Sequence, residues 1–305
     1  MTRFTRRQAL SAAAAVPLAA GLARPALAAA DKQGAATPSF NRVTLGDFEV
    51  TTIAAGAAVR EDPQSIFGMN VDAEAFQEVS DQNFLPTDKL VIPFTPTVVN
   101  TGAELILFDT GLNPEGTTGL LEQAGISADQ VDTVVLTHMH GDHIGGLSTD
   151  GAPTFANAKI ITGAAEHNYW AGADNDNFKG KVAPLNDRIS FLDDGGSVAS
   201  GITAMSAFGH TPGHMTYMIE SGGKQLVIFA DTANHYVWSL GYPDWEVRFD
   251  MDKAAAAATR RKVLSMLATD KIPFIGYHMP FPGMGYVETR GDGFRYVPVS
   301  YQMML

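Results

Sequence analysis

The sequence predicts an α/β protein in which two β-sheets pack together with helices on the outside. Short apolar runs bounded by turn residues, which are typical of strands, are followed by a helical pattern, and this succession occurs twice. The composition is that of a globular protein, with 45% hydrophobic and 18% charged residues in a chain of 305. It excludes a disordered, collagen-like or coiled-coil chain.

The first half of the chain carries several strand patterns. Strands are expected in the apolar stretches 43–53 and 91–107, with turns at 45–47 and 100–102, and also at 105–108, 131–136 and 159–162. Short helices are expected at 117–123 and 164–170. The strand at 105–108 continues into Asp-Thr-Gly and the strand at 131–136 into Thr-His, so polar side chains directly follow buried strands.

The second half repeats this arrangement. Its expected strands are 202–207, 216–220 and 226–230. The clearest helix of the sequence is expected at 252–267, where either Asp250 or Asp252 can cap the first turn and a run of alanines favours helix. Because no long linker interrupts the chain, we expect residues 29–305 to form a single domain.

Residues 1–28 have the features of a twin-arginine (Tat) signal peptide. Arg6 and Arg7 lie in a basic head, an apolar run follows that is too short to cross a membrane, and Ala-Leu-Ala at 26–28 provides a small-residue cleavage site. The alternative is an amphipathic helix that anchors the chain to a membrane. We expect export to the periplasm or secretion, with no membrane association after cleavage.

The charge and cysteine content exclude several functions. The chain has no cysteine, which excludes disulfide scaffolds, Cys-ligated zinc and thiol catalysis. The formal net charge is −12, and loss of the four arginines in residues 1–28 would make it −16. Such an acidic chain without a basic patch is not expected to bind nucleic acid.

The strongest motif is His-Met-His-Gly-Asp-His at residues 138–143, directly after a predicted strand. Two histidines two residues apart can direct their rings to one metal ion from a tight turn, and the following Asp and His can reach a second ion. Imidazole and carboxylate ligands without thiolate suit Zn, Mn, Fe or Co.

Four ligands from one loop do not complete two metal sites, and further candidates lie near other strand ends. His210 and His214 occupy a glycine-rich turn between two predicted strands. Asp231 directly follows an apolar strand, and His278 follows an apolar run at 272–277. We expect these side chains to gather at one end of the two sheets.

Together these motifs resemble the metallo-β-lactamase superfamily of hydrolases. The matching segments are Asp-Thr-Gly at 109–111, His-x-His-x-Asp-His at 138–143, Gly-His-Thr-Pro-Gly-His at 209–214, Ala-Asp-Thr at 230–232 and the late histidine at 278. The resemblance extends over nearly all of the chain after residue 28. It implies a four-layer αββα sandwich with a two-metal site at the strand ends between the sheets.

The resemblance also implies which residues bind the ions. For the first ion these are His138, His140 and His210, and for the second Asp142, His143 and His278, with Asp231 bridging both. His214 is the alternative to His210, but the resemblance favours His210 and leaves His214 to orient a ligand through a hydrogen bond. Asp109 is expected to support a ligand in the same way, the alternative being a turn residue.

The chemistry implied by this site is hydrolysis. Two divalent ions about 3.5 to 4 Å apart lower the pKa of a bridging water, so that hydroxide forms near neutral pH. We expect zinc at both positions, with manganese, iron or cobalt as alternatives. Asp142 is the expected catalytic residue, because it can accept the proton of the nucleophile and later assist the leaving group.

A narrower resemblance to methyl parathion hydrolases and related lactonases and arylesterases lies in residues 45–50, 209–220 and 278–297. Trp170 falls where these relatives have a pocket tryptophan, and the aromatic residues of the chain favour an apolar substrate. The candidates for the pocket wall are Trp170, His235, Trp238 and Phe281, together with Tyr242 and Trp245. For each aromatic residue the alternative is packing in the core.

We therefore expect an exported, dinuclear, metal-dependent hydrolase of small apolar esters, namely aryl esters, lactones or phosphotriesters. Alternatives with the same ligand loop are an acyl-homoserine-lactone lactonase, a thioesterase of the glyoxalase II type and a mononuclear iron enzyme of the persulfide dioxygenase type. Such lactonases often have Tyr three residues after the bridging Asp, where this chain has Asn234. A non-catalytic binding protein is disfavoured by the complete ligand set, and a homodimer is compatible with the sequence.

Overall fold

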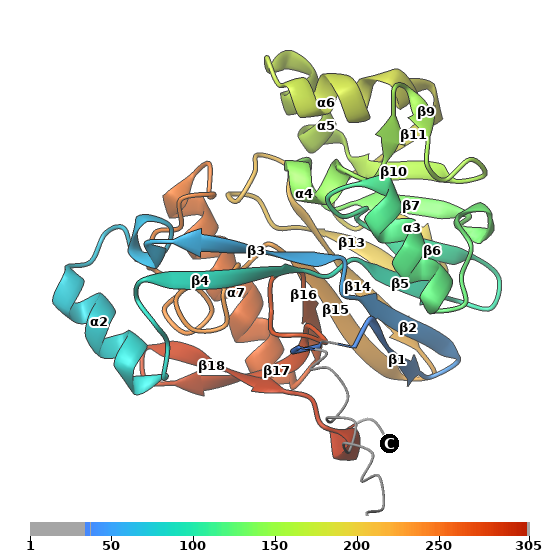
Figure 1. Cartoon of the computed structure of the whole chain (residues 1–305). Coiled ribbons are helices and arrows are strands. Elements are labelled where there is room, and N and C mark those ends of the chain that lie inside the picture. The colour runs from blue at the N-terminus through green and yellow to red at the C-terminus, as the bar shows by residue number, and fades with distance from the viewer. Residues whose placement is uncertain (1–33, 37, 304–305) are drawn as a thin grey trace, which may run out of the picture. The chain divides into compact units, whose positions relative to one another are not determined.

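Two seven-stranded sheets form the framework of the computed structural model, which describes residues 34–36 and 38–303 (Figure 1). The first sheet has the order β1 (Phe40–Leu45), β2 (Phe48–Ile53), β5 (Thr97–Asn100), β6 (Leu105–Phe108), β7 (Thr133–Leu136), β10 (Lys159–Gly163) and β11 (Ile189–Leu192). The second has the order β12 (Ser197–Ala199), β13 (Ile202–Ser206), β14 (Met215–Ser221), β15 (Lys224–Ala230), β16 (Phe274–Gly276), β17 (Met284–Arg290) and β18 (Gly293–Pro298).

Helices and two antiparallel strand pairs complete the structure, and the first of these pairs has residues 62–88 between its strands. The helices are α2 (Ala73–Gln82), α3 (Pro114–Gln123), α4 (Gly141–Ile144), α5 (Ala164–Gly172), α6 (Asp176–Lys181) and α7 (Lys253–Asp270). One hairpin joins β3 (Gly56–Glu61) to β4 (Lys89–Phe94), and a small one joins β8 (Ser148–Thr149) to β9 (Ala152–Pro153). Short 3₁₀ turns occur at Pro63–Ser65, Ala128–Gln130, Ala183–Arg188 and Tyr301–Met303.

The packing of the sheets and helices gives four layers. Buried side chains of both sheets, such as Ile106 and Ile228, meet in the core between them. Helices α3, α5 and α6 cover the outer face of the first sheet, while α7 covers the outer face of the second (Figure 1). The predicted αββα sandwich is therefore confirmed.

The central strands are apolar on both faces because each face is covered. In β7, Val134 and Leu136 face the helices, whereas Val135 faces the opposite sheet. In β15, Phe229 packs against α7 and Ile228 faces the first sheet. Such strands are buried along their length, so their carboxyl ends can carry polar side chains into the space between the sheets.

The expected strand at 91–107 is wrong in one respect. Residues 95–96 interrupt it, because β4 leaves the sheet to pair with β3, whereas β5 joins β2 and β6. The β3–β4 hairpin and α2 enclose a further apolar cluster that includes Phe67, Phe76 and Trp238. The sequence did not predict β3 or α2.

The helix boundaries follow from their caps. Helix α3 begins three residues earlier than expected, because the Asn113 side chain accepts a hydrogen bond from the backbone of Gly116. Helix α7 is capped by Asp252, whose side chain accepts from Ala255, so the alternative cap Asp250 is free for another role.

The predicted signal peptide at residues 1–28 and its boundary with the domain lie outside the described residues. Within residues 34–36 and 38–303, the helices lack the combination of length and apolar character needed to cross a bilayer.

Candidate metal centre

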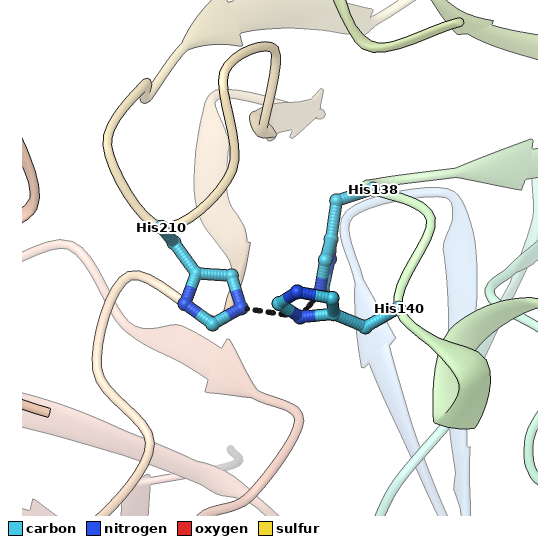
Figure 2. Close-up of side chains that lie close together, drawn as sticks. All are labelled: His138, His140 and His210. Atoms are coloured by element: carbon cyan, nitrogen blue, oxygen red, sulfur yellow. Dashed lines mark hydrogen bonds between the residues drawn. The ribbon is translucent and has the colours of Figure 1, made fainter. Parts of the chain in front are cut away.

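Three histidines from two loops form the first cluster, which consists of His138, His140 and His210. His138 and His140 lie between β7 and α4, at the end of the first sheet, and His210 lies between β13 and β14 of the second. The Nδ1 atom of His140 is 3.1 Å from Nε2 of His138 and 3.0 Å from Nε2 of His210. Figure 2 shows these ring nitrogens directed toward one another, as around a single ion.

The second cluster consists of Asp142, His143 and His278. Asp142 and His143 lie in α4, and His278 follows β16. Oδ2 of Asp142 is 3.6 Å from Nε2 of His143 and 3.4 Å from Nε2 of His278. The late histidine is therefore brought to the loop of residues 138–143 by the end of a strand in the other sheet.

Asp231 lies between the two clusters. Its Oδ2 is 3.3 Å from Nε2 of His210 and 3.1 Å from Nε2 of His278, while its Oδ1 is 3.3 Å from Nε2 of His143. The preceding Ala230 has a left-handed backbone with φ of 46°, which costs energy for a residue other than glycine. This turn at the end of β15 directs the carboxylate toward both clusters.

The donor set fits a pair of divalent ions. Among the described residues, Nε2 of His143 and Oδ1 of Asp231 are buried without a hydrogen-bond partner. Buried polar atoms without partners are costly and uncommon, and a cation between them would satisfy both. Imidazole nitrogens and carboxylates are ligands of zinc and similar metals.

The protonation of the centre is coupled to cation binding. Burial lowers the pKa of His143, but the carboxylates of Asp231 and Asp109 outweigh it and hold this pKa well above its usual value. For His210 burial also lowers the pKa, yet hydrogen bonds to Asp231 and Asp250 raise it to about 9. Metal ligands must be deprotonated, so cation binding here is accompanied by proton release.

Asp109 and His214 support this centre through hydrogen bonds to the ligands and to the nearby backbone. Oδ2 of Asp109 is 2.8 Å from Nδ1 of His143, and Oδ1 accepts from the backbone of Thr137 at 2.9 Å. Nδ1 of His214 is 3.1 Å from the carbonyl of Ala207, while its Nε2 accepts the backbone N–H of Asp231. Both ring nitrogens of His214 are thus occupied, whereas His210 reaches the first cluster.

A buried ion pair that the sequence did not predict holds His210. Oδ1 of Asp250 lies 2.9 Å from Nδ1 of His210, and its Oδ2 accepts from Arg260 at 2.6 Å. Arg260 is only 1% exposed and also donates to the backbone carbonyls of Thr232 and Pro243. The sequence feature that could have revealed this role is the position of Arg260 on the apolar face of α7, one turn before Val263.

Tyr277 is a second residue that the sequence did not single out. Its hydroxyl donates to the backbone carbonyl of Asp142 at 2.6 Å. Its ring packs on that of His143, with centroids 3.9 Å apart. Tyr277 therefore supports the two ligands that come from α4.

A cavity of about 350 Å³ opens directly onto the centre. The side chains of Asp231, Asp142, His140 and His278 border it. Its remaining wall is largely apolar and includes Ala58, Phe67, Ile92, Phe94, Leu112 and Phe249. Arg60 is the one basic side chain among the described residues that line it.

The expected pocket residues are distributed differently from the prediction. His235 and Phe281 line a neighbouring cavity of about 630 Å³, which shares Phe94 and His278 with the first. Trp170 is buried, and its ring meets that of His140 edge-on with the ring centroids 5.9 Å apart.

The expectation that Trp238 lines the pocket needs correction. Trp238 stacks on Phe76 and donates its indole N–H to Ser80 in the cluster beneath α2. Trp245 likewise stacks on Phe76 and on Tyr242. These aromatic residues stabilise the packing of α2 and lie outside the cavity wall described above.

The fold and the two clusters define a metal-dependent hydrolase, and the chain belongs to the metallo-beta-lactamase superfamily. The model of that family matches residues 95–272, more than half of the chain. The recognition of this superfamily from the sequence motifs is therefore confirmed.

Similar solved structures include AidC, a dizinc quorum-quenching lactonase in complex with a product. It has a TM-score of 0.78 and 28% sequence identity, over 86% of this chain and 98% of AidC. The hydrolase AbOPH of the beta lactamase superfamily has a TM-score of 0.80 with 23% identity, over 88% of this chain and 99% of AbOPH. At this identity the similarity supports the fold and nothing further.

Curated relatives match over part of their length. An N-acyl homoserine lactonase of Bacillus cereus is 27% identical over 147 residues, which are 48% of this chain and 56% of the relative. The uncharacterised protein YobT of Bacillus subtilis (strain 168) is 26% identical over 159 residues, which are 50% of this chain and 66% of YobT. The chain thus spans between half and two thirds of these relatives.

Proposed function

We propose that this protein is a dinuclear lactonase that opens neutral acylated lactones of the N-acyl homoserine lactone type. The observation that carries the proposal is the apolar cavity of about 350 Å³ that ends on the side chains of both clusters. The similarity to the dizinc lactonase AidC, over 98% of that chain, supports it. Aryl esters and phosphotriesters, also expected from the sequence, become comparison substrates.

The cavity wall suits an acyl chain. Leu112 and Phe249 line the cavity while remaining 43% and 38% exposed, so apolar surface is available near its opening. Burying each methylene of a substrate contributes about 0.8 kcal/mol. We therefore expect kcat/KM to rise with the length of the acyl chain until the cavity is filled.

The charges favour a neutral substrate. Asp142 and Asp231 border the cavity, and Arg60 is the only Lys or Arg among the described residues that line it. The whole chain is also acidic, with a formal net charge of −12. Anionic esters would be repelled except by the ions themselves, whereas a neutral lactone would not.

The residues around the centre have separate tasks in the proposed reaction. Two zinc ions would supply a nucleophile from water and polarise the lactone carbonyl. Asn234 donates to Oδ2 of Asp231 at 2.7 Å and fixes the direction of that carboxylate. Asp142, with a side chain 24% exposed toward the cavity, is the group that can accept the proton and return it to the leaving alkoxide.

The test is a comparison of kcat/KM on one zinc-loaded preparation. The substrates are N-hexanoyl homoserine lactone, p-nitrophenyl acetate, a phosphotriester, a glutathione thioester and a β-lactam. We expect the lactone to be hydrolysed at least about tenfold more efficiently than the others, equivalent to about 1.4 kcal/mol. A tenfold preference for the thioester or the β-lactam would contradict the proposal.

A matched pair of variants tests the cavity. Phe249→Ala should lower kcat/KM for N-decanoyl more than for N-butanoyl homoserine lactone, because it removes apolar wall but no ligand. Phe84→Ala is the control, since Phe84 is 96% exposed and is not among the residues lining the cavity. Equal losses for both chain lengths would argue against an acyl-chain site here.

Export is a separate proposal. We propose that residues 1–28 direct the chain through the Tat pathway, on the basis of Arg6, Arg7 and the Ala-Leu-Ala segment at 26–28. Protein purified from the periplasm of its host should then begin near Ala29. An intact Met1 on membrane-bound protein would contradict it.

A further inference from the structure

Glu166 is a buried carboxylate that lies between the two loops of the first cluster. It belongs to the first turn of α5 and is completely buried. Its Oε1 accepts the backbone N–H of Met139 at 2.9 Å and the indole N–H of Trp170 at 2.6 Å. Its Oε2 accepts the hydroxyl of Thr211 at 2.7 Å and the backbone N–H of Gly213 at 2.9 Å.

These four donors adjoin every member of the first cluster. Met139 stands between His138 and His140 in the sequence, and Thr211 directly follows His210. The ring of Trp170 meets that of His140 edge-on. A displacement of Glu166 would therefore be transmitted to all three histidines.

Helix α5 and the loop of residues 209–214 are in close backbone contact. A Cβ atom on Gly213 would lie 2.0 Å from the backbone nitrogen of Glu166, so only glycine allows this approach. The loop of residues 209–214 is thus held against the start of the helix by both packing and hydrogen bonds. Since this loop comes from the second sheet and α5 from the first, the contact joins the two halves of the sandwich.

Energetics explain why a carboxylate is needed here. A backbone N–H that loses its only partner in a buried site costs about 1 to 3 kcal/mol, and hydrogen bonds to a charged acceptor are stronger than those between neutral groups. Glu166 satisfies two such backbone groups at once, one in each loop. One carboxylate therefore joins the backbone of both loops.

We propose that Glu166 is a positioning residue that sets the distance between the loops carrying His138, His140 and His210, and thereby the affinity for the first metal ion. It does not line the cavity, so this role is separate from substrate contact. The proposal rests on the proposed dinuclear function. It predicts that a change at Glu166 weakens one ion selectively.

The test is Glu166→Gln, which keeps the shape of the side chain. Glutamine offers one carbonyl oxygen, so its amide nitrogen must face either Met139 and Trp170 or Thr211 and Gly213. The backbone donors of Met139 and Gly213 cannot become acceptors. Loss of a group hydrogen-bonded directly to a ligand typically costs about 10- to 100-fold in metal affinity, and Glu166, which holds the neighbours of the ligands, should not exceed this range.

The measurement is a Zn²⁺ titration of the metal-free full chain in competition with a chelator, analysed for two sites. We expect the affinity of one site to fall about 10- to 100-fold and that of the other to change by less than about twofold. Thr211→Val, which removes one of the four hydrogen bonds, should give a smaller change in the same site. A Co²⁺-loaded Glu166→Gln protein should show an altered visible spectrum for that site alone.

Ser80→Ala is the matched control. It removes two buried hydrogen bonds in the cluster beneath α2. Ser80 accepts one from the indole of Trp238 at 3.0 Å and donates the other to the backbone carbonyl of Phe76 at 2.7 Å. We expect it to lower stability without changing either metal affinity. If Glu166→Gln behaves like this control, or weakens both sites equally, Glu166 is structural only and the proposal is wrong. A wild-type chain that binds no zinc would instead contradict the proposed function itself.

Discussion

The two clusters share Asp231 but are supported by different means. The first cluster is held by two buried carboxylates, Glu166 between its loops and Asp250 behind His210, and the latter is paired with Arg260. The second cluster has one buried carboxylate behind it, Asp109 at 2.8 Å from Nδ1 of His143, and Nδ1 of His278 lies 2.8 Å from the backbone carbonyl of Pro93.

The clusters are alike in exposure. Each has two buried histidines, His138 and His210 in the first and His143 and His278 in the second, and one part-exposed residue that borders the cavity, His140 or Asp142. The difference between the clusters therefore lies in the number of buried carboxylates that support them. The following predictions test this difference.

The largest effect is expected from Asp231→Ala, because Asp231 is the carboxylate that faces both clusters. The metal content should fall from two ions per chain to one or fewer, and kcat/KM for the lactone by roughly a thousandfold or more. Elemental analysis and kinetics on the same preparation measure both. A variant that retains two ions would show that Asp231 does not bridge the clusters.

A large loss of stability is expected from Arg260→Met. Removal of one partner from a buried ion pair costs about 3 to 5 kcal/mol. Here Asp250 would keep only the ring of His210 as a partner, and the carbonyls of Thr232 and Pro243 would lose their donor. Urea unfolding of the metal-free protein measures this loss. The double variant Arg260→Met, Asp250→Asn should regain part of the stability, and metal binding should weaken at the first cluster only. Weaker metal binding at the second cluster as well would show that the ion pair does not support the first cluster alone.

The pH dependence of stability should report His235, which borders the cavity beside His278. Burial lowers the pKa of His235 to about 3, and in the unfolded chain the ordinary value of 6.5 applies. The unfolded state therefore takes up a proton as the pH falls below 6.5, while the folded state stays neutral until about pH 3. The stabilising contribution is present above pH 6.5 and is lost progressively between these two values.

His235→Asn isolates this contribution. Asn places an oxygen near the position of Nδ1, which accepts the backbone N–H groups of Val237 and Trp238. Between pH 7 and pH 5 the wild-type, metal-free protein should lose about 2 kcal/mol more of its free energy of unfolding than the variant. Parallel curves for the two proteins would show that the pKa of His235 is the same in the folded and unfolded states.

The smallest effect is expected from Tyr277→Phe. It removes the hydrogen bond to the carbonyl of Asp142 but keeps the ring against His143. The cost should be about 1 kcal/mol in stability. Metal titration should show a weaker second site and an unchanged first site. A weaker first site with an unchanged second site would show that Tyr277 supports the first cluster instead.

The sequence predicted those residues of the centre that directly follow an apolar strand. The apolar runs at 105–108, 131–136 and 226–230 are followed by Asp109, by Thr-His138 and by Asp231, and the structure places these strand ends together. Apolar strands covered on both faces are visible in a sequence because every position is hydrophobic.

The remaining features depend on contacts between distant segments. Glu166 and Arg260 are charged residues within helices, and their partners lie 45 and 10 positions away, at Thr211 and Asp250. Trp238 follows a ligand-bearing strand, but whether such a side chain faces the cavity or the core is decided by α2, which the sequence did not predict. The hairpin of β3 and β4, which forms one wall of the cavity, was missed for the same reason.

Anomalous diffraction from crystals of the zinc-loaded protein would locate the ions themselves. We expect two peaks per chain, one bound by His138, His140 and His210 and the other by Asp142, His143 and His278, with Asp231 between them. A single peak, or an ion bound by His214 in place of His210, would contradict the dinuclear centre described here.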